Sequence, residues 1–273
     1  MIARVPNNTL FSKAKVSRYR PEIDGIRAFA VVAVIVNHFN KDILPGGYLG
    51  VDIFFVISGY VITSSLYGRS SKNFKNFISG FYERRIKRIL PALIINVLIV
   101  SLLICLFNSH PTRDLKTGAL SLLGISNIFL AFLSTDYFGT DASLNIFTQT
   151  WSLGVEEQFY FIYPLIAWFS GFSKVSKIKN FSIILGLLGA FSLASFLGNT
   201  DEYGAYYLTN YRFWEIAAGC LTFLFSTKEN ACKFLRIIPS FLTVSIITLA
   251  MFLPVQTGRS ITLLVVIMTT LLL

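Results

Sequence analysis

The chain has 273 residues and a formal net charge of +10, and 54% of its residues are hydrophobic while only 14% are charged. Because a soluble domain of this size carries about 25% charged residues, the composition indicates an integral membrane protein and excludes a soluble domain of any size. Of the 24 lysines and arginines, 13 lie in residues 1–27 and 69–88, beside apolar runs. This placement favours a positive-inside topology and attraction to anionic lipid, and it argues against nucleic acid binding.

Apolar runs long enough to cross a bilayer recur along the sequence and predict an all-α, polytopic transmembrane helix bundle. After a basic cytoplasmic segment at residues 1–20, we expect one membrane domain over residues 21–273 with about eight or nine spans. The last run reaches residue 273 with no polar segment after it, so we expect the sequence to stop short of the complete bundle. The predicted spans are residues 22–40, 48–67, 89–107, 117–133, 152–170, 181–198, 207–226, 237–253 and 260–273.

The charges of the loops conflict with a simple alternation of these spans. The lysine-rich loop at 174–179 belongs on the cytoplasmic side, whereas loop 134–150 has no lysine or arginine and belongs outside. If residues 89–107 and 117–133 both crossed the membrane, loop 134–150 would return to the cytoplasm. We therefore predict that 117–133, the more polar of the two, does not cross fully, as is tolerated where protein or water covers the backbone.

The three cysteines are dispersed: Cys105 and Cys220 lie in apolar runs, and Cys232 lies in a short basic loop. This odd, scattered set predicts neither a disulfide framework nor a metal site. We therefore look for chemistry among the ionisable residues of the apolar runs, because each costs several kcal/mol in a bilayer unless it is paired or hydrated.

The first such stretch is EIDGIRAFAVVAVIVNHF, residues 22–39, with Arg27 near its start and His38 near its end. Eleven residues of helix place the two on one face, within about 20°, and about 16 Å apart. His38 is a candidate general base inside the membrane. Asp24 suits the positive end of the helix and is a further candidate. Alternatively, Arg27 only anchors the helix at the inner surface, and His38 is an interfacial residue bonded to a carbonyl.

The second stretch is GGYLGVDIFFVISGY, residues 46–60, in which Asp52 stands just inside an apolar run. Its glycines permit close helix approach, and Asp52 is a candidate site residue. The alternative is helix packing through small residues beside an interfacial carboxylate.

The third stretch is FYERRIKRILPAL, residues 81–93, where four basic residues precede a proline and an apolar span. On a helix, Arg84 and Arg88 share a face and Arg85 lies beside it, an arrangement suited to phosphate groups. Positive-inside anchoring remains the alternative.

The fourth stretch is TWSLGVEEQFYFIYP, residues 150–164, with adjacent carboxylates at Glu156 and Glu157. Neighbouring helical residues point about 100° apart, so we expect at most one of them to face a shared cavity. Trp151 is a further candidate because an aromatic ring near the outer end could stack on a sugar. The alternative is an interfacial carboxylate at a helix N-terminus.

Together these stretches resemble the acyltransferase-3 family of integral membrane acyltransferases, which O-acetylate bacterial surface polysaccharides. The family pattern of arginine, ten residues, then histidine is met by Arg27 and His38. Its arginine-rich segment is met by RRIKRILP through Arg85 and Arg88, and its Trp-Ser-Leu-x-x-Glu-x-x-Phe-Tyr pattern is met by WSLGVEEQFY through Glu156.

The resemblance implies a membrane O-acyltransferase of the bacterial inner membrane, with its N-terminus in the cytoplasm. The implied donor is cytoplasmic acyl-CoA, most often acetyl-CoA. The implied acceptor is a hydroxyl of an envelope glycan such as lipopolysaccharide O-antigen, exopolysaccharide or peptidoglycan, and no metal is expected. The family domain usually holds about ten spans, which exceeds the number expected here.

Within that reaction, His38 is expected to deprotonate the acceptor hydroxyl or to carry the acyl group transiently. Glu156 is expected to orient the imidazole or to stabilise its charged form. Arg27, Arg85 and Arg88 are expected to hold the phosphates of the CoA.

Two other functions remain open at this stage. In a transporter or flippase of lipid-linked glycans, the same intramembrane charges would line a translocation pathway. In an inactive, truncated remnant, they would have no substrate.

Overall fold

The structure is a computed structural model, and it describes residues 20–67, 73–135, 142–171, 178–200, 202–227, 239–253 and 258–273. Residues 1–19 of the predicted basic segment, Cys232 and most of the lysine-rich loop lie outside these residues. The described residues form helices and turns with no strand, which confirms the predicted all-α membrane helix bundle.

Except at the predicted spans 89–107 and 117–133, the helices follow the predicted spans closely, because a long apolar run forms a helix that satisfies its own backbone hydrogen bonds. Among the described residues, three helical segments are long and apolar enough to cross a membrane: Gly47–Leu66, Phe74–Phe107 and Ile178–Gly198. The elements are α1 (Pro21–Phe39), η1 (Gly47–Leu49), α2 (Gly50–Leu66), α3 (Phe74–Phe107), α4 (Thr112–Leu122), α5 (Ser126–Thr135), η2 (Ala142–Leu144), α6 (Thr150–Phe169), α7 (Ile178–Gly198), α8 (Glu202–Tyr207), α9 (Thr209–Ser226), α11 (Ser240–Met251) and α12 (Gly258–Leu272).

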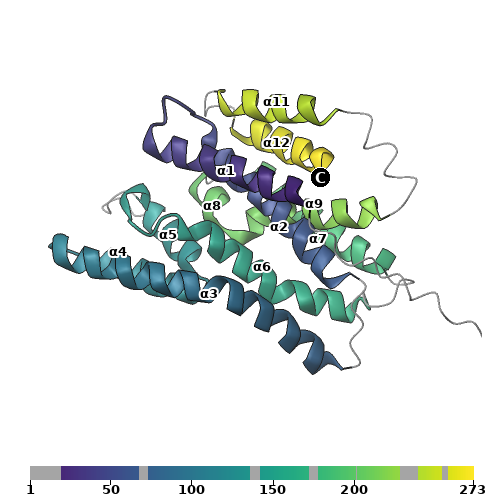
Figure 1. Cartoon of the computed structure of the whole chain (residues 1–273), viewed down its shortest axis with the longest axis horizontal. Coiled ribbons are helices and arrows are strands. Elements are labelled where there is room, and N and C mark those ends of the chain that lie inside the picture. The colour runs from purple at the N-terminus through teal and green to yellow at the C-terminus, as the bar shows by residue number, and fades with distance from the viewer. Residues whose placement is uncertain are drawn as a thin grey trace, which may run out of the picture.

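The bundle has α2 and α9 at its centre and shorter or more exposed helices around them (Figure 1). On one side, α1, α11 and α12 share a hydrophobic cluster with α2. At the opposite edge of the view, α3 and α4 lie alongside each other, with α6 between them and α1. In this view α1, α6 and α3, which are far apart in the sequence, follow one another across the bundle (Figure 1).

Helix α3 begins well before the predicted span at 89–107. Its first half carries the arginine-rich segment, and it is helical because Phe77 and Phe81 are buried against the bundle, with the Phe77 ring 5.5 Å from that of Trp168 on α6. Its second half is apolar and largely exposed, as a lipid-facing helix is. The arginines and the span thus belong to one continuous helix.

Residues 117–133, predicted not to cross the membrane fully, form no single long helix in the structure. The segment is broken into α4 and α5 by Gly124, whose φ of 69° is in the left-handed region that glycine tolerates. Each helix is about 16 Å long or less, and a bilayer core is about 30 Å thick. Gln158 of α6 covers the break by donating a hydrogen bond to the Gly124 carbonyl at 3.0 Å.

Helices α2 and α9 touch backbone to backbone. A Cβ atom at Gly219 would collide with the carbonyl of Val56, and one at Gly59 would collide with the carbonyl of Ile216. Small residues at such a contact permit van der Waals packing between helices that lipid alone does not drive together. The spacing between α2 and α9 is therefore set by these two glycines.

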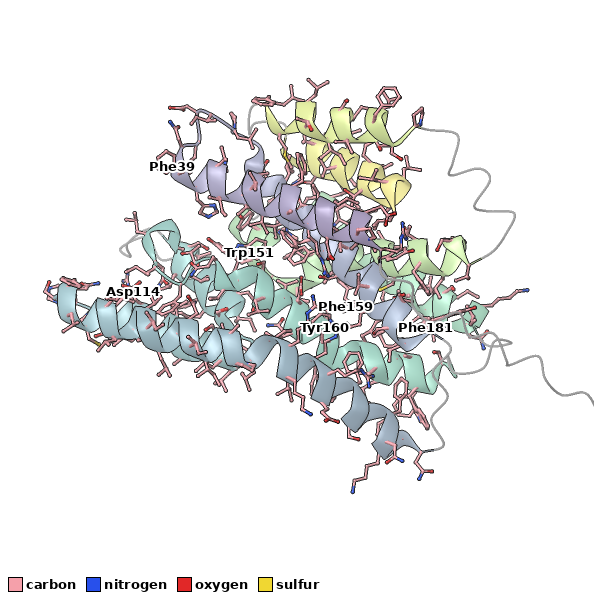
Figure 2. The ribbon with its side chains drawn as sticks, in the orientation of Figure 1. Phe39, Asp114, Trp151, Phe159, Tyr160 and Phe181 are labelled. Carbon is pink, nitrogen blue, oxygen red and sulfur yellow. The ribbon has the colours of Figure 1, made fainter. Side chains whose placement is uncertain are left out.

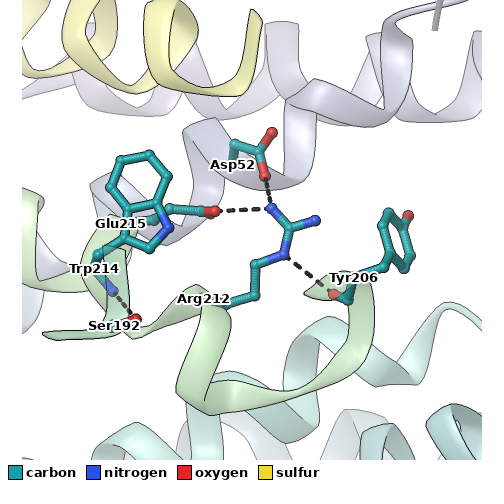
Figure 3. Close-up of polar contacts among 6 residues, drawn as sticks. All are labelled: Asp52, Ser192, Tyr206, Arg212, Trp214 and Glu215. Carbon is teal, nitrogen blue, oxygen red and sulfur yellow. Dashed lines mark hydrogen bonds and ion pairs between the residues drawn. The ribbon is translucent and has the colours of Figure 1, made fainter. Parts of the chain in front are cut away.

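A buried ionic cluster joins the same two helices (Figure 3). The Arg212 guanidinium of α9 donates hydrogen bonds to Asp52 of α2 at 3.0 Å and to Glu215 at 2.8 Å. Arg212 also donates to the carbonyl of Tyr206 at 3.1 Å. All three charged side chains are at least 95% buried, so each charge depends on its partners rather than on water.

We expect Gly219→Ala to prevent stable folding, because its methyl group would push α9 away from the backbone of α2. Gly186→Ala on α7 is the matched control, since nothing lies within 4 Å of a Cβ atom there. The measurement is the amount of monodisperse protein recovered from membranes and its melting temperature in detergent. Equal recovery of the two variants would contradict the role of the contact.

We also expect Arg212→Met to destabilise the protein far more than Glu215→Gln. The first change leaves two buried carboxylates without a counter-charge, a loss worth about 3–5 kcal/mol. The second keeps an oxygen for Arg212 and leaves one guanidinium facing one carboxylate. Thermal melting of both purified variants is the measurement, and a greater loss in Glu215→Gln would refute this account of the cluster.

Candidate active site

Glu156, the predicted carboxylate of α6, is held by two hydroxyl groups. Ser58 of α2 donates a hydrogen bond to one carboxylate oxygen at 2.7 Å, and Tyr160 donates to the other at 2.8 Å. Ser58 and Tyr160 are themselves buried, which fixes the direction of both donors. The carboxylate is therefore positioned before any substrate binds.

The three predicted arginines gather around this carboxylate. The Arg27 guanidinium of α1 lies within electrostatic reach of Glu156 and Arg88. Arg85 stacks over the ring of Tyr160, with its guanidinium carbon 4.7 Å from the ring centre. In the view of Figure 2, Tyr160 lies on α6 between α1 and α3, which carry these arginines.

Among the described residues, this cluster holds more arginines than carboxylates. Asp24 lies 3.7 Å from Arg27, but this pair is partly exposed. No described carboxylate forms an ion pair with Arg85 or Arg88. A site that holds more guanidinium groups than carboxylates attracts anions, and guanidinium groups suit phosphates in particular.

His38 lies at the far end of α1 from Arg27 and is exposed. Its Nδ1 is 2.9 Å from the carbonyl oxygen of Val34, one turn earlier in the same helix. Since a carbonyl only accepts, Nδ1 carries the proton in this contact and Nε2 is left as an acceptor. Among the described residues, no hydrogen bond joins His38 to Glu156, so the structure does not bring these two candidates together.

Trp151 and Asp52 belong to the neighbourhood of Arg212. Trp151 is buried rather than exposed: its ring centre lies 4.5 Å from that of Tyr206 and 5.8 Å from the guanidinium carbon of Arg212. Asp52 is bonded to the same guanidinium from the other helix. These two candidates therefore surround Arg212 and have no described contact with the arginines of α3.

Sequence reasoning missed the residues that position the site. Tyr160 stands four residues after Glu156, the helical spacing at which side chains meet, and this signal could have been used. Arg212 and Glu215 are ionisable residues inside a predicted span, which by itself marks candidates. Nothing in the sequence distinguished Ser58 from other small residues of α2.

Comparison with known proteins identifies the family of the chain. The family model described as an acyltransferase domain matches residues 20–273. The chain is 35% identical over 207 residues to "Peptidoglycan O-acetyltransferase OatA" of Listeria monocytogenes, covering 74% of this chain and 33% of the relative. It is 35% identical over 224 residues to "O-acetyltransferase OatA" of Staphylococcus aureus, covering 79% of this chain and 37% of the relative.

The chain thus spans about a third of the length of these relatives. No solved structure matches it. The family match nevertheless covers every helix described above and every residue of the candidate site. The chain belongs to the acyltransferase-3 family of integral membrane acyltransferases.

Proposed function

We propose that this chain is the membrane part of an O-acetyltransferase, which moves an acetyl group from cytoplasmic acyl-CoA to a hydroxyl of an envelope glycan. The observation that carries the proposal is the gathering of Arg27, Arg85, Arg88 and Glu156 from three helices inside a membrane bundle. Charged groups are costly in such a place unless they are paired, hydrated or bound to a substrate. The names of the relatives supply the reaction type.

The arginine cluster is the proposed donor site. CoA carries phosphates, and guanidinium groups bind phosphates through paired N–H donors. Arg85 and Arg88 lie on one helix, one turn apart, and Arg27 faces them from α1. With the N-terminus in the cytoplasm of a bacterial cell, this cluster would be open to the donor from the inner side of the membrane.

His38 is the proposed general base for the acceptor. The contact of Nδ1 with the Val34 carbonyl leaves Nε2 to accept the proton of a glycan hydroxyl. The oxygen would then attack the thioester carbonyl, and the thiolate of CoA would leave and take up a proton. His38 stands about 16 Å along α1 from Arg27, a distance that the flexible arm of CoA would have to bridge.

Among acceptors we favour peptidoglycan, because the Listeria relative is named a peptidoglycan O-acetyltransferase. Lipopolysaccharide and exopolysaccharide remain acceptors that the chemistry of the site would also serve. A transporter or flippase would move its substrate without consuming acyl-CoA. Reconstitution of the protein in vesicles with labelled acetyl-CoA and envelope glycan therefore tests the proposal, and the absence of labelled glycan would refute it.

We expect His38→Ala to lower acetyl transfer about 100-fold or more, since a general base contributes roughly that factor. Binding of acetyl-CoA should be unchanged, because His38 is remote from the arginines. His110→Ala is the matched control: His110 is exposed and lies in the turn after α3. Substantial transfer by His38→Ala at normal membrane levels would remove the assignment.

We expect Arg27→Ala to abolish transfer, and the pair Arg85→Ala with Arg88→Ala to weaken binding of the acetyl-CoA donor. Each lost charged hydrogen bond is worth about 1.5–3 kcal/mol, so acetyl-CoA affinity should fall about tenfold or more per arginine. The pair Lys75→Ala with Lys87→Ala removes the same charge from exposed positions of α3. Calorimetry with acetyl-CoA is the measurement, and unchanged affinity in the arginine variants would refute the donor site.

A further inference from the structure

A large cavity lies among α3, α6, α7 and α9, beside the turn between α4 and α5. Its volume is about 870 Å³, within the range of ligand sites. None of its described lining residues belongs to α1, the helix that carries Arg27 and His38. The cavity is therefore a candidate for a ligand other than the acceptor of the proposed reaction.

The walls of the cavity are mostly apolar and continue onto the lipid-facing surface of the bundle. Ile86 of α3, Phe161 of α6 and Phe191 of α7 line it, and these side chains are 52%, 66% and 71% exposed. The apolar second half of α3 is also largely exposed. Acyl chains of the bilayer can therefore enter the cavity from the side without passing through water.

Several polar groups of the cavity gather at one end, around the turn at Gly124. Gln158 donates hydrogen bonds to the Gly124 carbonyl and to Asn127, and it accepts one from the hydroxyl of Thr209. Glu157 lies at the same turn, because a Cβ atom on Gly124 would collide with its carboxylate. Glu157 and the start of α9 thus belong to one polar end of the cavity.

Glu157 is the charged group of this polar end, and it lacks a partner. The adjacent Glu156 accepts hydrogen bonds from Ser58 and Tyr160. None of the described residues donates a hydrogen bond to Glu157 or forms an ion pair with it, although the side chain is only partly exposed. A carboxylate in the wall of an apolar membrane cavity is costly unless it is paired or hydrated, so this position favours a cationic ligand.

Two neighbouring features suit an ammonium group that is joined to a phosphate. Phe161 lines the cavity one helical turn after Glu157, at the spacing at which side chains of a helix meet. An aromatic ring beside a carboxylate favours an ammonium group. Asn210 lines the cavity in the first turn of α9, where its side-chain amide and the positive end of the helix favour a phosphate.

We propose that this cavity binds a zwitterionic phospholipid with a primary ammonium head group. The ammonium donates to Glu157, the phosphate lies at Asn210, and the acyl chains lie along the apolar walls. Arg85 also lines the cavity, but its guanidinium lies over the Tyr160 ring and stays available to the proposed donor. The lipid fills the space beside α6 and stabilises the bundle, a role that is independent of acetyl transfer.

Photolabelling of the purified protein in vesicles tests the head-group preference. The probe is phosphatidylethanolamine with a diazirine in one acyl chain, and the matched probe is phosphatidylglycerol with the same chains. We expect phosphatidylethanolamine to label the cavity segments of α3, α6 and α7 about tenfold more strongly, the value of a hydrogen bond between charged groups. Equal labelling by the two probes would show an ordinary lipid surface and overturn the inference.

Substitution of Glu157 tests the recognition of the ammonium group. Glu157→Gln keeps the shape of the side chain and should lower phosphatidylethanolamine labelling about tenfold, while phosphatidylglycerol labelling stays the same. Glu157→Lys should reverse the preference between the two lipids. Glu22→Gln removes the same charge from an exposed position of α1 and is the matched control. No loss in Glu157→Gln, or an equal loss in Glu22→Gln, would contradict the assignment.

Two further variants locate the lipid within the cavity. Leu188→Trp should reduce labelling severalfold by filling the space, whereas Leu187→Trp, exposed on α7 and outside the lining, should not. Arg85→Ala should leave phosphatidylethanolamine labelling unchanged. Loss of labelling in Arg85→Ala would place the phosphate at the arginine instead and would overturn the inference.

The melting temperature in detergent provides a second measurement, because a ligand that binds the folded state stabilises it. Added phosphatidylethanolamine should raise the melting temperature of the unmodified protein more than phosphatidylglycerol does, and this difference should vanish in Glu157→Gln. An equal rise with both lipids in the unmodified protein would refute the preference. None of these measurements uses acetyl-CoA, so their outcome does not depend on the proposed function.

Discussion

The backbone contact between α2 and α9 at Gly59 and Gly219 is the constraint on which the rest of the protein depends. In a bilayer, helices gain little from burying apolar side chains, so close packing and polar bonds must hold them together. The Arg212 cluster adds the polar bonds at the same interface. Because α2 also carries Ser58, the position of this interface sets where the Glu156 carboxylate of α6 is held.

Two groups of intramembrane charges have opposite balances. Around Arg212, two buried carboxylates meet one guanidinium at 3.0 and 2.8 Å. Around Glu156, three arginines outnumber the two carboxylates of Glu156 and Asp24, and Arg88 is exposed. Buried charges that are hydrogen-bonded to one another hold helices together, whereas a partly exposed excess of positive charge attracts anions. We therefore propose a structural role for Arg212 and a substrate-directed role for Arg85 and Arg88.

The sequence alone predicted the helices well, because runs of apolar residues in lipid have one way to satisfy their backbone. It singled out residues 117–133 as an incomplete crossing, since loop charges constrain how many times the chain can cross, but it did not predict the helix break at Gly124. It did not predict the true start of α3, where burial of Phe77 and Phe81 extends the helix. Contacts between helices that are distant in sequence, such as Ser58 with Glu156, could not be predicted, because residue spacing along one helix does not show which helix packs beside it.

The broken hairpin of α4 and α5 has a consequence for how the protein could diversify. A full-length span at this position would fill the space beside α6 with side chains, but the turn at Gly124 ends above it and forms one wall of the cavity. The turn residues Leu122, Leu123 and Ile125 line that wall without belonging to the α2–α9 interface. Substitutions there could reshape the cavity at small cost to stability, so that ligand preference and folding can change independently during evolution.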